Sequence, residues 1–259
     1  MKRKKWPQSY TGRTLTVYII LRLIVIATMI LSFLSRNYQN VFMCVLTLSL
    51  FYMPDILQRR LRVYLPDALE IIILVFIFAA EILGEIQSFY VKIPIWDTLL
   101  HTTTGFLAAA VGFSMVDLLN RNEQFSIKMS PIYMAVAAFC FSMTIGVMWE
   151  FFEFAMDVFF GMDTQKDTVI SGFSSVLLNP EPVNEAIKYR DITSTAVNGQ
   201  VLGINGYLDI GLYDTMMDLL VNFIGAVVFS VIGFFYVKYR DRHSFVDKII
   251  PKPQEESKS

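Results

Sequence analysis

The sequence has few charged side chains and almost no cysteine. Only 17% of its 259 residues are charged, whereas ordinary soluble domains have about 25%. With a net charge of -1, it gives no support for a nucleic-acid partner, because binding the phosphate backbone needs a concentrated basic surface. Both cysteines, Cys44 and Cys140, lie in apolar runs, where a thiol usually acts as a small hydrophobic group. We therefore expect neither a disulfide framework nor a thiol metal motif.

Apolar residues are abundant instead, and they occur in long runs. They make up 54% of the chain, and a membrane span needs about 17 to 25 of them in succession. Such runs indicate a polytopic membrane protein, which we interpret as an all-α bundle of six transmembrane helices. The first run follows MKRKK but lacks a small-residue cleavage site, so we expect it to be retained as a span. The six predicted segments are 14–34, 39–57, 68–88, 98–119, 131–160 and 213–237.

The basic residues predict the orientation of these spans. The N-terminal segment, the second and fourth loops and the C-terminal tail together hold 16 of the 22 Lys and Arg residues, whereas the other three loops hold 5. Cytoplasmic loops are the ones enriched in Lys and Arg, so both termini are predicted to be cytoplasmic. The expected organisation is a basic N-terminus of residues 1–13, a membrane domain of 14–237 containing an extracytoplasmic loop of 161–213, and a tail of 238–259.

Polar residues gather at the outer ends of three predicted spans. The motifs are WDTLLHTTTG in the fourth span, WEFFEFAMD in the fifth and YDTMMDLLVNFIG in the sixth. At 100° per residue, the acids within each motif lie on one face of their helix. Glu81 and Glu85 are one turn apart near the outer end of the third span. Each of these helices is therefore predicted to carry one polar stripe.

A charge at the centre of a bilayer costs roughly 2.5 to 3.5 kcal/mol, so carboxylates in a membrane normally face the interior of the bundle. No basic side chain lies in the same half of the predicted spans, which means that these acids need protons, a divalent metal or a Lys or Arg from a loop. Carboxylates with one imidazole are ligands typical of Zn, Mn or Fe. We predict a metal site formed by Asp97, His101, Glu150, Glu153, Asp157, Asp214 and Asp218, with catalytic roles for His101, Glu150 and Asp218.

Structural interpretations of the same residues remain open. A lone acid at the mouth of a helix is often only solvated, which applies to Asp97, Asp157 and Asp214. His101 taken singly would more often be a hydrogen-bonded packing residue. The glycines in these helices are most simply positions of close helix packing.

The loop of 161–213 is much longer than the others. Ile170, Phe173, Val176 and Leu177 have helical spacing, which predicts a short amphipathic helix on the outer surface. Asn198-Gly199 and Asn205-Gly206 predict tight turns, with one small hairpin. The loop is either a lid over the acidic stripes or a solvated connection.

Four motifs in this order, WDTLLHTTTGF, WEFFEF, GMDTQKDT and DIGLYDTMMDLLVNFIGA, resemble the YjdF-like family of bacterial multi-pass inner-membrane proteins, which has no established activity. A weaker likeness is to VanZ-like membrane proteins, in which Asp97, His101, Asp218, Asn222 and Gly225 would correspond to family positions. That family usually has a Lys after the first Asp and a Phe after the His, whereas this chain has Thr98 and Thr102. The resemblance implies a bacterial inner-membrane location and a role at the cell envelope.

Three functions remain compatible with the sequence. The first is a metal-dependent hydrolase or phosphotransferase acting on an envelope lipid, because a bound metal activates water and polarises phosphoryl oxygens. The second is a proton- or metal-coupled transporter. The third is a scaffold whose polar stripes join helix to helix. Membrane lipids and a divalent cation are the predicted partners, with no nucleic acid.

Overall fold

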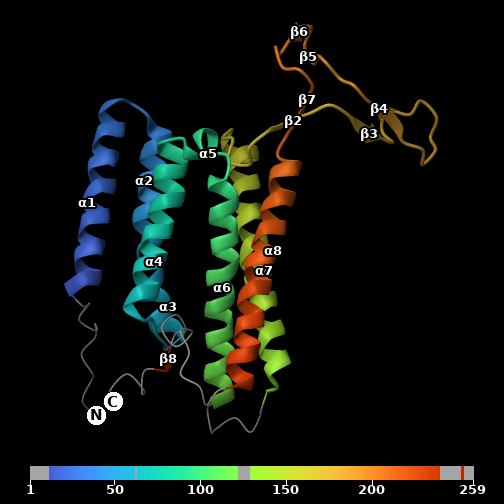
Figure 1. The fold of residues 1–259 in the computed structure, drawn as a ribbon. Helices are drawn as coiled ribbons and strands as arrows, with labels where there is room; N and C mark the ends of the chain where they lie inside the picture. Colours follow the sequence, from blue (N-terminus) through green and yellow to red (C-terminus); the bar gives the residue numbers. More distant parts are fainter. Residues whose placement is uncertain (1–11, 62, 122–128, 240–251, 254–259) are drawn as a thin grey trace. The chain divides into compact units, whose positions relative to one another are not determined.

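The structure is a computed structural model that describes residues 12–61, 63–121, 129–239 and 252–253. The predicted cytoplasmic N-terminus and C-terminal tail therefore lie almost wholly outside the described residues. The chain divides into two compact units, one of Met1–Thr144 with Val221–Ser259 and the other of Ile145–Leu220. Figure 1 labels the elements along the chain.

The first unit begins with three helices, α1 (Gly12–Leu34), α2 (Tyr38–Leu50) and α3 (Met53–Leu61). The Asn37 side chain accepts a hydrogen bond from the Asn40 amide at 3.1 Å and caps the start of α2. Between α2 and α3 the chain turns at Phe51, whose carbonyl accepts a hydrogen bond of 3.0 Å from the Tyr18 hydroxyl of α1. Pro54 fits the first turn of α3, where its missing N–H leaves no bond unmade. This break lies where Pro54 and Asp55 interrupt the second predicted span.

The third predicted span divides into two elements, α4 (Asp67–Phe78) and the π-helix η1 (Ala79–Ile86). The Gln87 amide donates to the Ile82 carbonyl at 3.0 Å, the five-residue step of a π-helix. A short helix, α5 (Phe89–Lys92), follows it. Gly84 permits this arrangement, because a Cβ there would lie 2.3 Å from the Tyr90 ring. The apolar pattern of residues 68–88 did not predict the π-helix.

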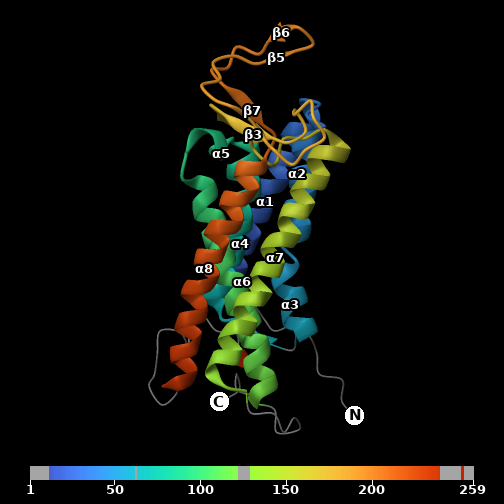
Figure 2. The same ribbon diagram turned by 90° about the vertical axis from the view of Figure 1, so that its right-hand side faces the viewer.

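A second core in this unit joins α6 (Trp96–Arg121), the first part of α7 (Pro131–Phe160) and the later part of α8 (Leu212–Lys238). Small residues let these helices approach closely, which matters in a membrane because lipid competes for apolar contacts. Phe229 lies edge-on to Phe106 and Phe113. In Figure 1 the later part of α8 runs beside α6, and Figure 2 shows the same helices after a turn of 90°. The buried members are Ala109, Ala110, Phe113, Met134, Ala138, Ala226 and Phe229.

The second unit contains the end of α7, the start of α8 and six short strands between them. These strands pair antiparallel as β2 (Thr168–Ile170) with β7 (Tyr207–Asp209), β3 (Phe173–Ser175) with β4 (Ile187–Tyr189), and β5 (Ala196–Val197) with β6 (Gln200–Val201). The first unit holds one more antiparallel pair, β1 (Val63–Tyr64) with β8 (Lys252–Pro253).

The loop confirms one local prediction and corrects another. Asn198 and Gly199 have φ of 52° and 79° and form the predicted two-residue hairpin between β5 and β6. The predicted amphipathic helix is wrong, because Ile170 and Phe173 lie in strands β2 and β3. Each strand finds its partner far along the chain, and such pairing overrides a weak helical pattern.

Among the described residues, five helices are long and apolar enough to cross a membrane. They correspond to the first, second, fourth, fifth and sixth predicted segments. The fifth matches its helix in full, because α7 runs over 131–160. The third segment is absent from this group because α4 and η1 are each shorter than a span. A membrane protein made mostly of helices is therefore shown, while the sixth span and the cytoplasmic termini remain predictions.

Candidate functional site

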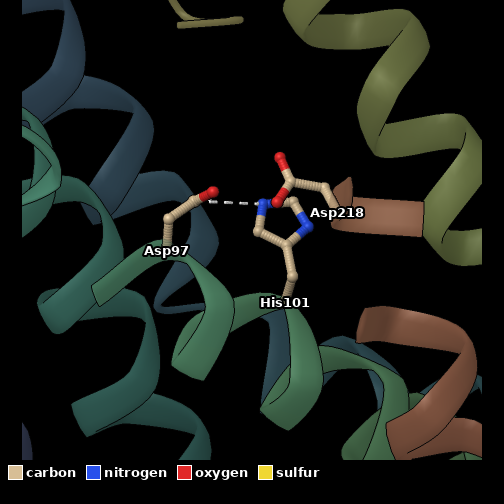
Figure 3. Close-up of side chains that lie close together, drawn as sticks. All are labelled: Asp97, His101 and Asp218. Carbon is tan, nitrogen blue, oxygen red and sulfur yellow. Dashed lines mark ion pairs between the residues drawn. The ribbon is translucent and has the colours of Figure 1, made fainter. Parts of the chain in front are cut away.

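Asp97 and His101 form a pair at the start of α6. His101 follows Asp97 by one helical turn, and its Nε2 lies 3.5 Å from the Asp97 Oδ1 (Figure 3). Asp97 is in the first turn of the helix, where the helix dipole favours a negative charge. The His101 residue is only 9% exposed, so the imidazole is held inside the protein beside a carboxylate. Figure 3 also draws Asp218, which belongs to the second unit and is described with it below.

One turn deeper along α6, Gly105 marks a close crossing with α8. A Cβ on Gly105 would lie 2.0 Å from the Asn222 carbonyl oxygen, and a Cβ on Gly225 would lie 2.1 Å from the Thr102 carbonyl oxygen. The Ser142 hydroxyl of α7 donates to the Gly105 carbonyl at 2.7 Å. Within the first unit, the fourth, fifth and sixth predicted spans therefore pack against one another with almost no space between backbones.

The acidic stripe of α7 faces inward in the second unit. Glu150 is 4% exposed and Glu153 is partly buried. The neighbouring Phe151 and Phe154 are instead more than half exposed, as expected for side chains that face lipid. The stripe predicted from helical spacing is therefore correct for Glu150, since a lipid-facing carboxylate would be expensive.

Asp157 has a structural task at the end of α7. Its Oδ1 accepts hydrogen bonds of 2.6 Å from both the amide and the hydroxyl of Thr164, and its Oδ2 accepts one of 2.9 Å from the Gln165 amide. The Thr164 hydroxyl also lies 3.0 Å from the Glu153 carbonyl. Carboxylate acceptors make stronger hydrogen bonds than neutral ones. Both oxygens of Asp157 thus hold residues 164–166, which we call the strap, against α7.

Asp214 holds the same strap from α8. The Lys166 amide donates to the Asp214 Oδ2 at 2.8 Å, and the Gln165 side-chain amide donates to the Thr215 hydroxyl at 2.5 Å. Asp157 and Asp214 therefore lie at one level, on either side of the strap. The sequence placed both acids on the polar stripes but did not predict the strap, although GMDTQKDT supplies its residues.

Asp218 lies one turn deeper on α8 than Asp214, just as Glu153 lies one turn deeper on α7 than Asp157. The chain runs towards the strap along α7 and away from it along α8, so these two acids lie at matching distances from the strap. Asp218 is 3% exposed. The second unit therefore contains Glu150, Glu153 and Asp218 as inward carboxylates beneath a layer fixed by Asp157 and Asp214. Carboxylates of this kind are groups able to hold a divalent metal.

Several acidic side chains lie near Asp167, the residue that follows the strap. Asp167 itself is exposed. Partial desolvation raises the pKa of Asp167, and the carboxylates of Asp163, Asp209 and Asp157 raise it further, while Lys166 opposes them. Negative charge is therefore concentrated around Asp167, next to the strap.

Comparisons with known proteins agree with the membrane interpretation. Residues 17–239 match the model of a family described as predicted membrane protein (DUF2238). Neither the curated proteins nor the solved structures contain a significant match. Since the family model covers most of the chain, this protein belongs to the predicted membrane protein family DUF2238.

Proposed function

We propose that this membrane protein binds a divalent cation at the outer leaflet through Glu150, Glu153 and Asp218 of its second unit. The observation that carries the proposal is the burial of carboxylates on two helices at matching depth below the strap. Each buried charge needs compensation, because desolvating a carboxylate costs several kcal/mol. A divalent cation compensates two or three of them at once.

Asp157 and Asp214, which the sequence predicted as metal ligands, are not part of the proposed site. Both accept hydrogen bonds from the strap, so we assign them to positioning the strap. In the first unit, the Asp97 carboxylate beside His101 would fix the orientation of the imidazole ring. Such partners normally raise the basicity of a metal-binding imidazole.

The chemistry expected of such a site is hydrolysis or phosphoryl transfer on an envelope lipid of a bacterial inner membrane. A divalent metal polarises a phosphoryl oxygen and lowers the pKa of bound water. Glu150, for which the sequence predicts a catalytic role, would accept the proton of that water as a general base.

A cation-coupled transporter is the second candidate, and two buried acids elsewhere favour it. Glu70 is 5% exposed in the first turn of α4, and Asp117 is 4% exposed near the end of α6. Under the proposed topology both lie in the inner half of the bundle. A path for ions needs polar residues at several depths, and these two acids would supply the inner part of such a path.

Substitution by amides separates these candidates from a scaffold. Glu150→Gln, Glu153→Gln and Asp218→Asn keep the side-chain volume and remove the charge that a cation needs. We expect the purified parent protein to contain bound metal and to lose thermal stability in chelator, and each variant to lose both properties. Asp163→Asn is the matched control, because Asp163 is an exposed acid of the same unit.

The result decides among the three functions. A metal-free parent with no chelator response, and variants at least as stable as the parent, would refute the metal site and favour the scaffold. If metal is bound, a screen of lipid extracts for phosphate release tests the enzyme. Uptake of the same cation into proteoliposomes, lost in Glu70→Gln, tests the transporter.

A further inference from the structure

Strands β3 and β4 line an open, shallow cavity of about 510 Å³ that the proposed cation site does not use. Its lining comes from residues 171–174 and 188–191, all of them in the second unit. A cavity of this size is within the range of small-molecule sites, about 300 to 1,000 Å³. The charges and hydrogen-bonding groups of its lining residues indicate which ligand it would bind.

The strand register gives the cavity one basic wall. Ser174 pairs with Lys188, and Phe173 pairs with Tyr189. Side chains alternate along a strand, so Ser174, Lys188 and Arg190 share one face of the ribbon. Phe173 and Tyr189 share the other face, where their rings stack with centroids 5.2 Å apart. Residues of both faces line the cavity, and the basic face supplies its two positive charges.

Gly172 brings the two strands close at this position. A Cβ there would lie 2.6 Å from the Tyr189 carbonyl oxygen and 3.3 Å from the Arg190 Cα. The Ile192 amide donates to the Ser171 carbonyl at 2.9 Å, which continues the pairing beyond β3. The absence of a side chain at residue 172 therefore leaves the basic face open next to Arg190.

The positive charge of this wall contrasts with the mainly acidic segment of residues 161–211 that contains it. Between residues 161 and 211 the chain has six acids but only three basic residues, Lys166, Lys188 and Arg190. Two of those three line this cavity, and Asp191 is the one acid among its lining residues. Among the described residues, no carboxylate is paired with Lys188 or Arg190 within 4.0 Å. Both cations are therefore available to a ligand.

We propose that this cavity binds a phosphate ester through Arg190, Lys188 and the hydroxyls of Ser171 and Ser174. A guanidinium presents a planar fork of donors that matches phosphate oxygens, and an ammonium adds a compact second charge. The free oxygens of a phosphate ester, three in a monoester and two in a diester, accept hydrogen bonds from donors on both strands. The volume left beyond the phosphate accommodates the alcohol part of the ester. This proposal is independent of the proposed cation site.

The phosphate ester could come from a lipid headgroup or from a soluble compound, so the test uses both sources. The full-length protein in nonionic detergent is mixed with glycerol 3-phosphate, with dioleoyl phosphatidylglycerol, or with zwitterionic dioleoyl phosphatidylcholine, and bound ligand is counted by native mass spectrometry. We expect glycerol 3-phosphate to bind. If glycerol 3-phosphate displaces bound phosphatidylglycerol, the lipid headgroup is a source of the ligand. If glycerol 3-phosphate binds and phosphatidylglycerol is not retained, the ligand is a soluble ester. Retention of both lipids to the same extent, without binding of glycerol 3-phosphate, would overturn the proposal.

Four variants connect the binding to the cavity. Lys188→Gln with Arg190→Gln should weaken binding at least about tenfold, and Asp191→Asn should strengthen it by removing a repulsive charge. Gly172→Ala should abolish binding without a change of charge, because the new Cβ disturbs the strand pairing. Lys166→Gln is the control and should bind like the parent. Equal losses in Lys166→Gln and in the double variant, or normal binding by Gly172→Ala, would refute the proposed cavity.

Discussion

The crossing of α6 and α8 at Gly105 allows a quantitative test of the fold around the candidate site. In Gly105→Ala, the added methyl group would lie 2.0 Å from the Asn222 carbonyl oxygen and 2.8 Å from its carbon. Both obstacles are backbone atoms, so no rotamer change relieves the overlap. The methyl group reaches an ordinary contact only if α8 moves away from α6.

The size of the effect follows from that displacement. Moving from 2.0 Å to an ordinary contact of 3.4 Å separates the two backbones by about 1.4 Å. Overpacking typically costs 1 to 3 kcal/mol, and strain in the buried Ser142–Gly105 hydrogen bond adds roughly 1 kcal/mol. The better helix propensity of alanine offsets about 1 kcal/mol. We expect a net loss of roughly 1 to 3 kcal/mol in the free energy of unfolding.

Thermal unfolding of the purified protein in detergent measures this loss. For a protein of this size the melting temperature should fall by about 2 to 12 °C. Gly12→Ala is the control, because a Cβ there meets no atom within 4 Å, and we expect a change within about 0.5 kcal/mol. If Gly105→Ala melts within about 1 °C of the parent, α6 and α8 do not cross at this glycine and the close packing is wrong.

Three further predictions concern the second unit and the topology. Asp157→Ala should detach the strap, since Thr164 loses two hydrogen bonds, and proteolysis at the strap should become faster; unchanged proteolysis would contradict the role of Asp157. The pKa of Asp167 is raised in the fold, so its charged form opposes folding, and Asp167→Asn should raise the melting temperature at pH 7 but not at a pH below the unfolded-state pKa of about 3.9. A variant no more stable than the parent at pH 7 would argue against that repulsion. A reporter fused within residues 180–200 should read as extracytoplasmic and one at residue 245 as cytoplasmic, and the opposite result would refute the outer-leaflet site.

Sequence reasoning performed best where a structural feature depends on local composition. A helix satisfies all its backbone hydrogen bonds internally, so a long apolar run in a membrane has few alternatives. The match of the predicted fifth span with α7 and of the predicted sixth span with α8 follows from this constraint. The hairpin at Asn198-Gly199 is similarly local, because these two residues readily adopt positive φ.

Sequence reasoning failed where two distant segments compete with a local pattern. The spacing of Ile170 and Phe173 suggested a helix, yet β2 pairs with β7 some forty residues later, with Thr168 opposite Asp209. Nothing in either segment alone specifies that partner. The π-helix of residues 79–86 is a comparable case, because the contact between Gly84 and the Tyr90 ring depends on how the chain folds back after it.

The sequence by itself determined which carboxylates are costly, because an acid within an apolar helix has few favourable positions. It could not separate their tasks. Asp157 and Glu153 are one turn apart on the same face, but Asp157 receives hydrogen bonds from Thr164 and Gln165 at the strap, while Glu153 lies one turn below it. Only the tertiary structure decided this difference, because the strap donors come from a segment whose position depends on contacts with two helices rather than on its own residues.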